Sequence, residues 1–321
     1  MRTNHYGLLL NLKINLKLPL IFIVGPTAVG KSNFALRIAK ILGGEIINAD
    51  SMQVYSELRT LTARPSLNDE KLFPHHLYGY IKGSERYNVF KWCNDLSEIV
   101  NRNINKNIYS IIVGGTGMYI DKYLNGISKI PTIPEDYKKN SSEILKKIGQ
   151  KKFYEETKRI DKVSCQKISI NDTQRLKRIW EVYQYTNKPL SEWQIDKDKK
   201  IFSKNLKYKI FLFSPNREKI YLSVNERFKR MINSGVIDEV RNLLKLKLNT
   251  SLPIMRAHGV PEISNFLEGK INLEECIKNS QQVTRNYVKR QLTWWRSSKL
   301  DFTNIFEEFP ENIDAKSLNF E

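Results

Sequence analysis

The segment that decides the fold is Leu20-Ile-Phe-Ile-Val24 followed by Gly25-Pro-Thr-Ala-Val-Gly-Lys-Ser32. The first five residues form an apolar run of strand length, and the next eight match the pattern G-x-x-x-x-G-K-[ST] completely. Apolar residues at helical spacing follow in Asn33–Leu42. A strand, a glycine-rich turn and a helix in this order predict a phosphate-binding loop in an α/β protein, rather than a turn without a ligand.

The residue types of this loop suit a diphosphate. Its glycines let successive backbone N–H groups turn inward, Lys31 supplies a cation, and the Ser32 hydroxyl can ligate Mg²⁺. A hydrolysing NTPase normally places a magnesium-linked Asp after another buried strand, but the strand predicted over residues 108–113 ends in Gly114-Gly-Thr-Gly117. That turn either reaches phosphate oxygens or is simply tight. The predicted diphosphate-binding residues are Gly25, Pro26, Thr27, Ala28, Val29, Gly30, Lys31 and Ser32.

Asp50 ends a second predicted strand, over residues 45–49. Ligands of parallel sheets gather outside the carboxyl ends of the strands, so this carboxylate can hold a metal or remove a proton near Lys31. The structural alternative is an N-cap for the next helix. Ser51 and Gln53 carry donor and acceptor groups suited to reading a base edge.

Composition excludes several classes of protein. The 321 residues include 40% hydrophobic side chains, which excludes global disorder, and the longest apolar runs are too short to span a membrane. Three scattered cysteines exclude a disulfide framework and fit a reducing cytosol. The net charge of +19 indicates either a polyanionic partner such as nucleic acid or a lysine-rich composition without a function.

The charge is unevenly distributed along the chain. Residues 135–209 contain 20 Lys or Arg against 11 Asp or Glu, with helical patterns and little strand signal. Strand character resumes at 210–213, which favours a helical insertion into one α/β core. We expect an N-terminal extension (1–19), a core (20–133 and 206–300), a basic helical insertion (134–205) and a frayed acidic tail (301–321).

Several motifs together resemble one family, the tRNA dimethylallyltransferases. They are GPTAVGKS (25–32), NADSMQVY (48–55), PHHL (74–77), VGGTGMY (113–119), QRLKRIWEVY (174–183), GVIDEV (235–240), MRAHGVPE (255–262) and VKRQLTWWR (288–296). The phosphate loop alone is generic, whereas the combination of DSMQ, GGTG and KRQ-x-TW-x-R is specific. The resemblance covers roughly residues 20–300.

The resemblance implies transfer of a dimethylallyl group from dimethylallyl diphosphate to N6 of adenosine 37 in tRNA, assisted by Mg²⁺. It also implies a core like that of the phosphate-loop kinases (P-loop NTPase-like). On this reading Asp50 is the general base and a possible metal ligand, and Thr116 contacts the bridging oxygen of the diphosphate. Arg227 reaches the diphosphate, unless it forms a surface ion pair.

The same resemblance implies a set of contacts to the anticodon stem-loop. An exposed, solvated face is the alternative for the helical residues, and a place in the core is the alternative for Trp294. The predicted tRNA-binding residues are Asp50, Ser51, Met52, Gln53, Thr116, Lys138, Gln174, Arg175, Leu176, Lys177, Arg178, Arg256, Arg285, Lys289, Arg290, Gln291, Trp294 and Arg296.

Two departures from the family pattern and two other functions stay open. Val260-Pro261 replaces a common Tyr-Lys/Arg pair, and Lys138 replaces an Arg, which keeps the charge but not a bidentate fork. The other functions are a small-molecule kinase or adenylate prenyltransferase, and a non-catalytic RNA-binding protein. We expect a cytoplasmic monomer whose partners are tRNA and dimethylallyl diphosphate.

Overall fold

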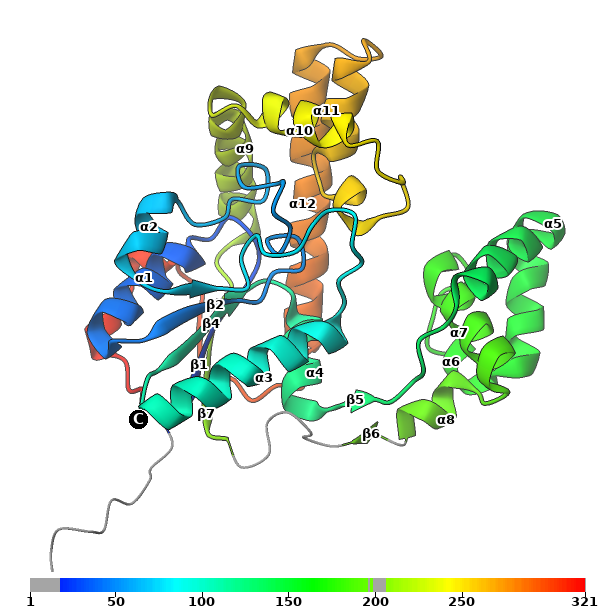
Figure 1. Cartoon of the computed structure of the whole chain (residues 1–321), viewed down its shortest axis with the longest axis horizontal. Coiled ribbons are helices and arrows are strands. Elements are labelled where there is room, and N and C mark those ends of the chain that lie inside the picture. The colour runs from blue at the N-terminus through cyan, green and yellow to red at the C-terminus, as the bar shows by residue number, and fades with distance from the viewer. Residues whose placement is uncertain (1–17, 196, 199–205, 321) are drawn as a thin grey trace, which may run out of the picture. The chain divides into compact units, whose positions relative to one another are not determined.

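The structure is a computed structural model that describes residues 18–195, 197–198 and 206–320 (Figure 1). The described residues form two compact units, one lying within residues 1–122 and 204–321 and the other within residues 123–203. The extension predicted for residues 1–19 lies almost entirely outside the described residues.

A six-stranded parallel sheet forms the centre of the larger unit, in the order β3-β2-β4-β1-β7-β8. Its register aligns Val24 with Gly114 and Asn48 with Val113, so β1, β2 and β4 end at the same edge. The predicted phosphate-loop α/β core is therefore confirmed. The strands are β1 (Leu20–Val24), β2 (Glu45–Asn48), β3 (His75–His76), β4 (Ser110–Gly114), β7 (Tyr208–Phe213) and β8 (Asn304–Phe306).

Continuous apolar runs form the inner strands because helices cover both faces of a parallel sheet. Every residue of β1 and β4 is buried. Helix α1 (Lys31–Leu42) follows β1 and packs Phe34, Ala35 and Ile38 into the same core. The apolar spacing read from the sequence thus corresponds to the buried face of this helix.

The larger unit contains further helices between and after its strands. Residues 273–297 form one continuous helix, α12, with Asn272 as its N-cap. Among the described residues, no helix is both long and apolar enough to cross a bilayer. The helices are α2 (Leu67–Leu72), α3 (Val89–Lys106), α4 (Gly117–Asn125, whose last three residues belong to the smaller unit), α9 (Arg217–Asn233), α10 (Val236–Lys245), α11 (Val260–Leu267) and α12 (Leu273–Ser297), with short 3₁₀ turns at Pro253–Arg256, Pro310–Asn312 and Ala315–Ser317.

The acidic segment 301–321 is folded over its described residues, which corrects the expectation of a frayed tail. Strand β8 pairs with β7, and Phe306 stacks on Phe213 with ring centroids 5.0 Å apart. Phe320 is buried against the same core. The Arg37 guanidinium of α1 also donates to the carbonyls of Pro310 and Ile313. The aromatic side chains dominate because their burial outweighs the solvation of the exposed acids between them.

The smaller unit is mainly helical. It contains α5 (Glu135–Ile160), kinked at Gly149, then α6 (Lys162–Cys165), α7 (Thr173–Thr186) and α8 (Leu190–Ile195). Strands β5 (Ile127–Ser128) and β6 (Lys197–Asp198) pair antiparallel at its two ends. The helices bury a small core of Phe153, Cys165, Leu176 and Ile179.

Candidate active site

The phosphate loop curls around a cavity of about 550 Å³ at the carboxyl edge of the sheet. Gly25 has φ +143°, and a Cβ at this position would overlap the backbone carbonyl of Phe213 in β7. Gly30 (φ +90°) then turns the chain into α1, whose amino end is directed at the cavity. Backbone amides and a helix dipole are thus placed to bind an anion.

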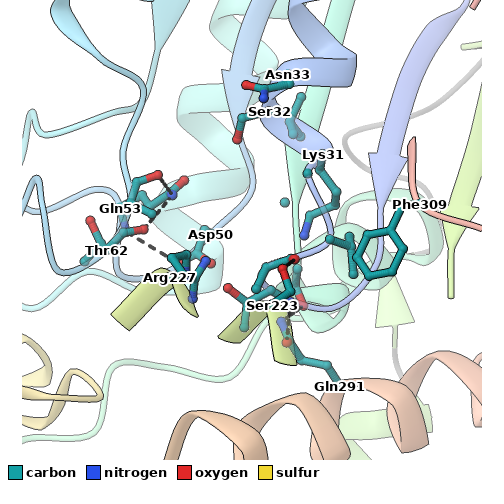
Figure 2. A pocket seen from close by; sticks show the side chains of 18 of the residues that line it. Lys31, Ser32, Asn33, Asp50, Gln53, Thr62, Ser223, Arg227, Gln291 and Phe309 are labelled. Atoms are coloured by element: carbon teal, nitrogen blue, oxygen red, sulfur yellow. Dashed lines mark hydrogen bonds between the residues drawn. The ribbon is translucent and has the colours of Figure 1, made fainter. Parts of the chain in front are cut away.

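Three cations and two carboxylates line this cavity, namely Lys31, Arg227, Arg230, Asp50 and Glu311. Figure 2 shows Lys31, Asp50 and Arg227 around it. Lys31 Nζ donates to the Pro26 carbonyl at 2.5 Å. Removal from water lowers the pKa of Lys31 to about 7; Asp50 opposes this lowering and Arg227 adds to it. Removal from water also lowers the pKa of Arg227 to about 10, again against the effect of Asp50. An entering anion would stabilise the charged form of both side chains.

Diphosphate binding is therefore expected to take up a proton. In the free protein Lys31 is mostly neutral at pH 8, and a bound anion raises its pKa, so binding at pH 8 takes up roughly one proton. Affinity for inorganic pyrophosphate should fall as pH rises above about 7. Calorimetry in buffers of different ionisation enthalpy at pH 8 measures this uptake. Lys31→Arg, which stays charged, should abolish it, and buffer-independent heats in the wild type would contradict the assignment.

Asp50 caps a turn rather than a helix, since the next helix, α2, begins at Leu67 with Ser66 as its N-cap. Asp50 Oδ1 accepts the Met52 N–H at 2.8 Å, which caps the turn after β2, and the Asn48 side chain holds the Asp50 backbone at 2.8 and 2.9 Å. Its Oδ2 has no hydrogen-bond partner within the described part of the chain. One oxygen thus fixes the turn, while the other is available for a ligand.

A second cavity, of about 190 Å³, adjoins the first. The two cavities share Thr27, Asp50, Thr62 and Arg227 as lining residues. The Asp50 carboxylate and the Arg227 guanidinium therefore lie where the cavity at the phosphate loop meets the smaller, partly apolar cavity. The other residues lining the smaller cavity are Ser51, Met52, Leu61, Arg256, Ala257, His258, Thr284 and Tyr287.

Gln291 was expected to contact tRNA, but its buried side chain joins two glycine-rich loops. Its Oε1 accepts the Thr27 N–H at 2.9 Å, and its Nε2 donates to the Gly115 carbonyl at 3.0 Å. Gly114 lies so close to Ala49 that a Cβ would overlap its backbone. The Gln291 amide thus holds the GGTG turn against the phosphate loop. This role is visible only in the tertiary structure, where two loops that are distant in the sequence come into contact.

Two other residues predicted to touch the substrate base also hold loops together. Gln53 Nε2 donates to the carbonyls of Thr62 and Ala63 at 2.8 and 3.0 Å, so both of its N–H groups are used and a bidentate contact with adenine is unavailable in this arrangement. Thr116 Oγ1 accepts the Ser51 N–H at 3.1 Å and lines neither cavity. Its role at the bridging oxygen stays a prediction.

The basic residues of α12 divide into two sets. Arg285 is turned toward α9, where it donates to Asn225 Oδ1 at 2.6 Å, whereas Lys289, Arg290 and Arg296 are exposed. Of the two adjacent tryptophans, Trp295 is buried. The ring of Trp294 covers Gly117, where a Cβ would overlap it.

In the smaller unit, the predicted tRNA-binding residues lie on α5 and α7. The prediction is wrong for Leu176, which is fully buried in the core of this unit and cannot face RNA. Gln174 is exposed, and Arg175 is exposed and paired with Asp172 at 2.5 Å. The other residues are Lys177, bonded to Ser142 at 2.5 Å, Lys138, paired with Glu135 at 2.9 Å, and Arg178, whose pKa is lowered by burial.

Tyr287 and His258 in the smaller cavity were missed from the sequence. Their rings pack with centroids 4.8 Å apart, and burial, with the Asp50 charge, raises the pKa of Tyr287. Tyr287, Gln291 and Trp294 are spaced i, i+4, i+7, which places them on one face of α12. This spacing was the signal in the sequence that could have identified Tyr287. No such signal exists for His258, which lies in a loop.

Comparison with known protein families gives two matches. The IPP transferase family model matches residues 53–298, and the isopentenyl transferase model matches residues 18–73. Proteins described as tRNA dimethylallyltransferase are similar over most of the chain. The one from Wolbachia pipientis wMel is 40% identical, covering 87% of this chain and 92% of its own length. The one from Bartonella henselae is 42% identical, covering 86% and 94%.

Two solved structures are also similar. The full-length tRNA isopentenylpyrophosphate transferase from Bacillus halodurans is 27% identical with a TM-score of 0.62, over 90% of this chain and 89% of its own. A eukaryotic dimethylallyltransferase, described as acting on tRNA, is 25% identical with a TM-score of 0.72, over 86% and 69%.

Proposed function

The chain belongs to the tRNA dimethylallyltransferase (IPP transferase) family, and we propose that it transfers a dimethylallyl group from dimethylallyl diphosphate to N6 of adenosine 37 in tRNA. One observation carries the proposal: an anion-binding chamber opens into a smaller chamber with Asp50 and Arg227 at the junction. A diphosphate in the first chamber would place its allylic carbon near this carboxylate.

The residues at the junction suit the two changes in the reaction. The bond from the allylic carbon to the diphosphate oxygen breaks, and Lys31, Arg227 and the loop amides stabilise the charge that develops on the leaving group. A bond forms between this carbon and N6, and the N6 proton goes to the free oxygen of Asp50. The adenine leaves its stack to reach the smaller cavity.

The oxygen donors of the larger cavity fit a magnesium ion. The Ser32 hydroxyl is a hard ligand of the kind Mg²⁺ prefers, and diphosphate oxygens would complete the shell. The second carboxylate oxygen of Asp50, the other candidate ligand, is assigned here to the N6 proton instead. Among the described residues there is no group of three or more His, Cys, Asp or Glu that could hold a metal unaided. The ion would neutralise charge on the diphosphate when bound.

Exposed cations supply the proposed tRNA-binding surfaces. Lys289, Arg290 and Arg296 of α12 are exposed and would contact the phosphate backbone, and Arg256 lines the smaller cavity. We propose that the helical unit, expected over residues 134–205, contributes Gln174, Arg175 and Arg178 to the same anticodon stem-loop.

The experiment is incubation of the protein with radiolabelled dimethylallyl diphosphate, Mg²⁺ and either unmodified tRNA or AMP. We expect label in tRNA, and none in a matched tRNA with guanosine at position 37, because guanine lacks the N6 amine. Label in AMP alone would indicate an adenylate prenyltransferase. Transfer of the ATP γ-phosphate without prenylation would indicate a kinase, and either outcome would contradict the proposal.

A further inference from the structure

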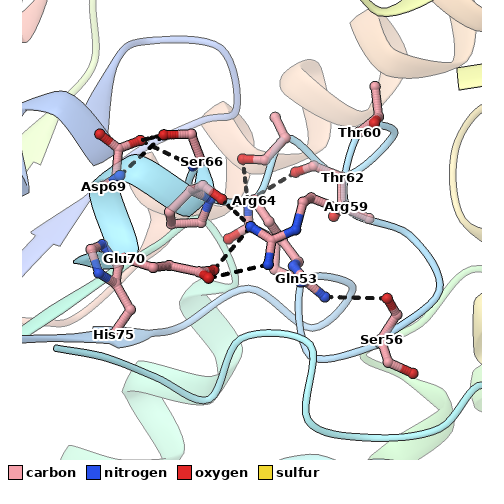
Figure 3. Close-up of polar contacts among 12 residues, drawn as sticks. Gln53, Ser56, Arg59, Thr60, Thr62, Arg64, Ser66, Asp69, Glu70 and His75 are labelled. Atoms are coloured by element: carbon pink, nitrogen blue, oxygen red, sulfur yellow. Dashed lines mark hydrogen bonds and ion pairs between the residues drawn. The ribbon is translucent and has the colours of Figure 1, made fainter. Parts of the chain in front are cut away.

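The loop segment 59–63 forms part of the wall of both cavities. Leu61 and Thr62 line the smaller cavity, and Thr62 and Ala63 line the larger one. The segment contains neither helix nor strand, so other groups must satisfy its backbone. Gln53 binds the carbonyls of Thr62 and Ala63 (Figure 3). This contact fixes the carboxyl end of the segment next to the Asp50 turn.

The amino end of the segment is held by one carboxylate from a distant helix. Glu239 of α10 accepts the N–H groups of Arg59 and Thr60 on Oε1, both at 2.7 Å, and that of Leu61 on Oε2 at 2.8 Å. Three successive amides directed at one anion form a backbone nest, and their bonds to a charged acceptor are stronger than those to a neutral one.

The same helical layer provides the opposite wall of the smaller cavity. Helix α10 packs against α11, and the residues just before α11 include Ala257 and His258, which line that cavity. At Gly259 a Cβ would overlap Leu61 Cδ1, so the two walls meet directly there. The contacts of Glu239 and Gly259 together set the separation between the segment 59–63 and the segment 256–258.

We propose that Glu239 is a positioning residue for prenyl transfer, which holds the segment 59–63 at the distance from Asp50 that the reaction requires. The proposal rests on the proposed function, and Glu239 itself lines neither cavity. A carboxylate is required because both of its oxygens accept. An amide would direct its own N–H groups at the backbone N–H of Leu61 or of Arg59 and Thr60.

The test compares Glu239→Gln, Glu239→Ala and Glu239→Asp with the wild type. Because misplacement by about 1 Å can cost 10²-fold, we expect kcat to fall by about 10-fold in the Gln variant and about 10²-fold in the Ala variant. The Asp variant, which keeps the charge on a shorter side chain, should recover part of the loss. The Kd for inorganic pyrophosphate should change by less than about 2-fold, because the phosphate loop is untouched.

Asp238→Asn is the matched control, because it removes the same charge from the neighbouring position. Asp238 is exposed and pairs with Arg241 on the same helix, so its variant should match the wild type. Amide hydrogen exchange at residues 59–61 should become faster in Glu239→Gln and Glu239→Ala but not in Asp238→Asn. This readout needs no catalysis, so failure of the proposed function is distinguishable from failure of this inference. Wild-type kcat in Glu239→Gln, unchanged exchange, or an equal loss in Asp238→Asn would overturn the proposal.

Discussion

Replacing Asp50 with asparagine is expected to lower kcat for prenyl transfer by about 10³-fold, within the usual contribution of a general base. The carboxylate has one oxygen in the turn after β2 and the other free at the junction of the two cavities. Asparagine keeps an acceptor for the Met52 N–H, so the turn should survive, but the amide cannot take the N6 proton. Single-turnover transfer of labelled dimethylallyl to tRNA measures the effect.

Comparison of Asp50→Ala with Asp50→Asn separates the loss of the general base from the loss of the turn. Asp50→Ala removes both oxygens and should be equally inactive, with an added loss of stability from the uncapped turn. Binding of tRNA, measured by filter retention, should stay nearly unchanged in both variants, because the exposed cations of α12 are distant in sequence and unaltered. A large loss of tRNA affinity would mean that Asp50 holds the acceptor rather than the proton.

Replacing Lys31 with alanine is expected to lower kcat by about 10²- to 10³-fold, as for the loss of one preorganised donor to a developing oxyanion. Lys31 lies at the start of α1 and lines the larger cavity together with Arg227 and Asp50. The affinity for inorganic pyrophosphate should fall in parallel, because the leaving group and the free anion use the same cation. Pre-steady-state transfer and calorimetry measure the two effects.

Lys40→Ala is the control for this variant. Lys40 lies in the last turn of the same helix and is exposed, so its replacement removes the same side chain from α1 without touching the cavity. Wild-type activity is expected for it. If Lys31→Ala kept wild-type kcat and pyrophosphate affinity, the diphosphate would have to bind away from the phosphate loop.

The sequence was sufficient where a feature is encoded by neighbouring residues. The phosphate loop is one continuous segment, and its glycines, lysine and serine follow a strand whose apolar run was visible. Asp50 was found for the same reason, since a strand end can be read from five residues. The register of β1, β2 and β4 then brings these positions to one edge, as a parallel sheet requires.

The sequence was insufficient where a side chain meets a partner far along the chain. Gln291 bonds to Thr27, 264 positions away, and looks from the sequence like part of a basic RNA-binding motif. Leu176 lies between cationic residues, yet its helical face is buried in the small core. The acidic composition of 301–321 likewise concealed the aromatic residues that dock this segment on β7.

Glu239 shows the same division most clearly. Helix α10 begins at Val236 and carries two neighbouring acids, Asp238 and Glu239, in its first turn. The packing of α10 decides which of these two acids is solvated and which one binds three amides of the segment 59–63. That segment lies nearly 180 residues earlier in the chain. Local periodicity determines which face of an element is buried; only tertiary packing decides which distant backbone that face meets.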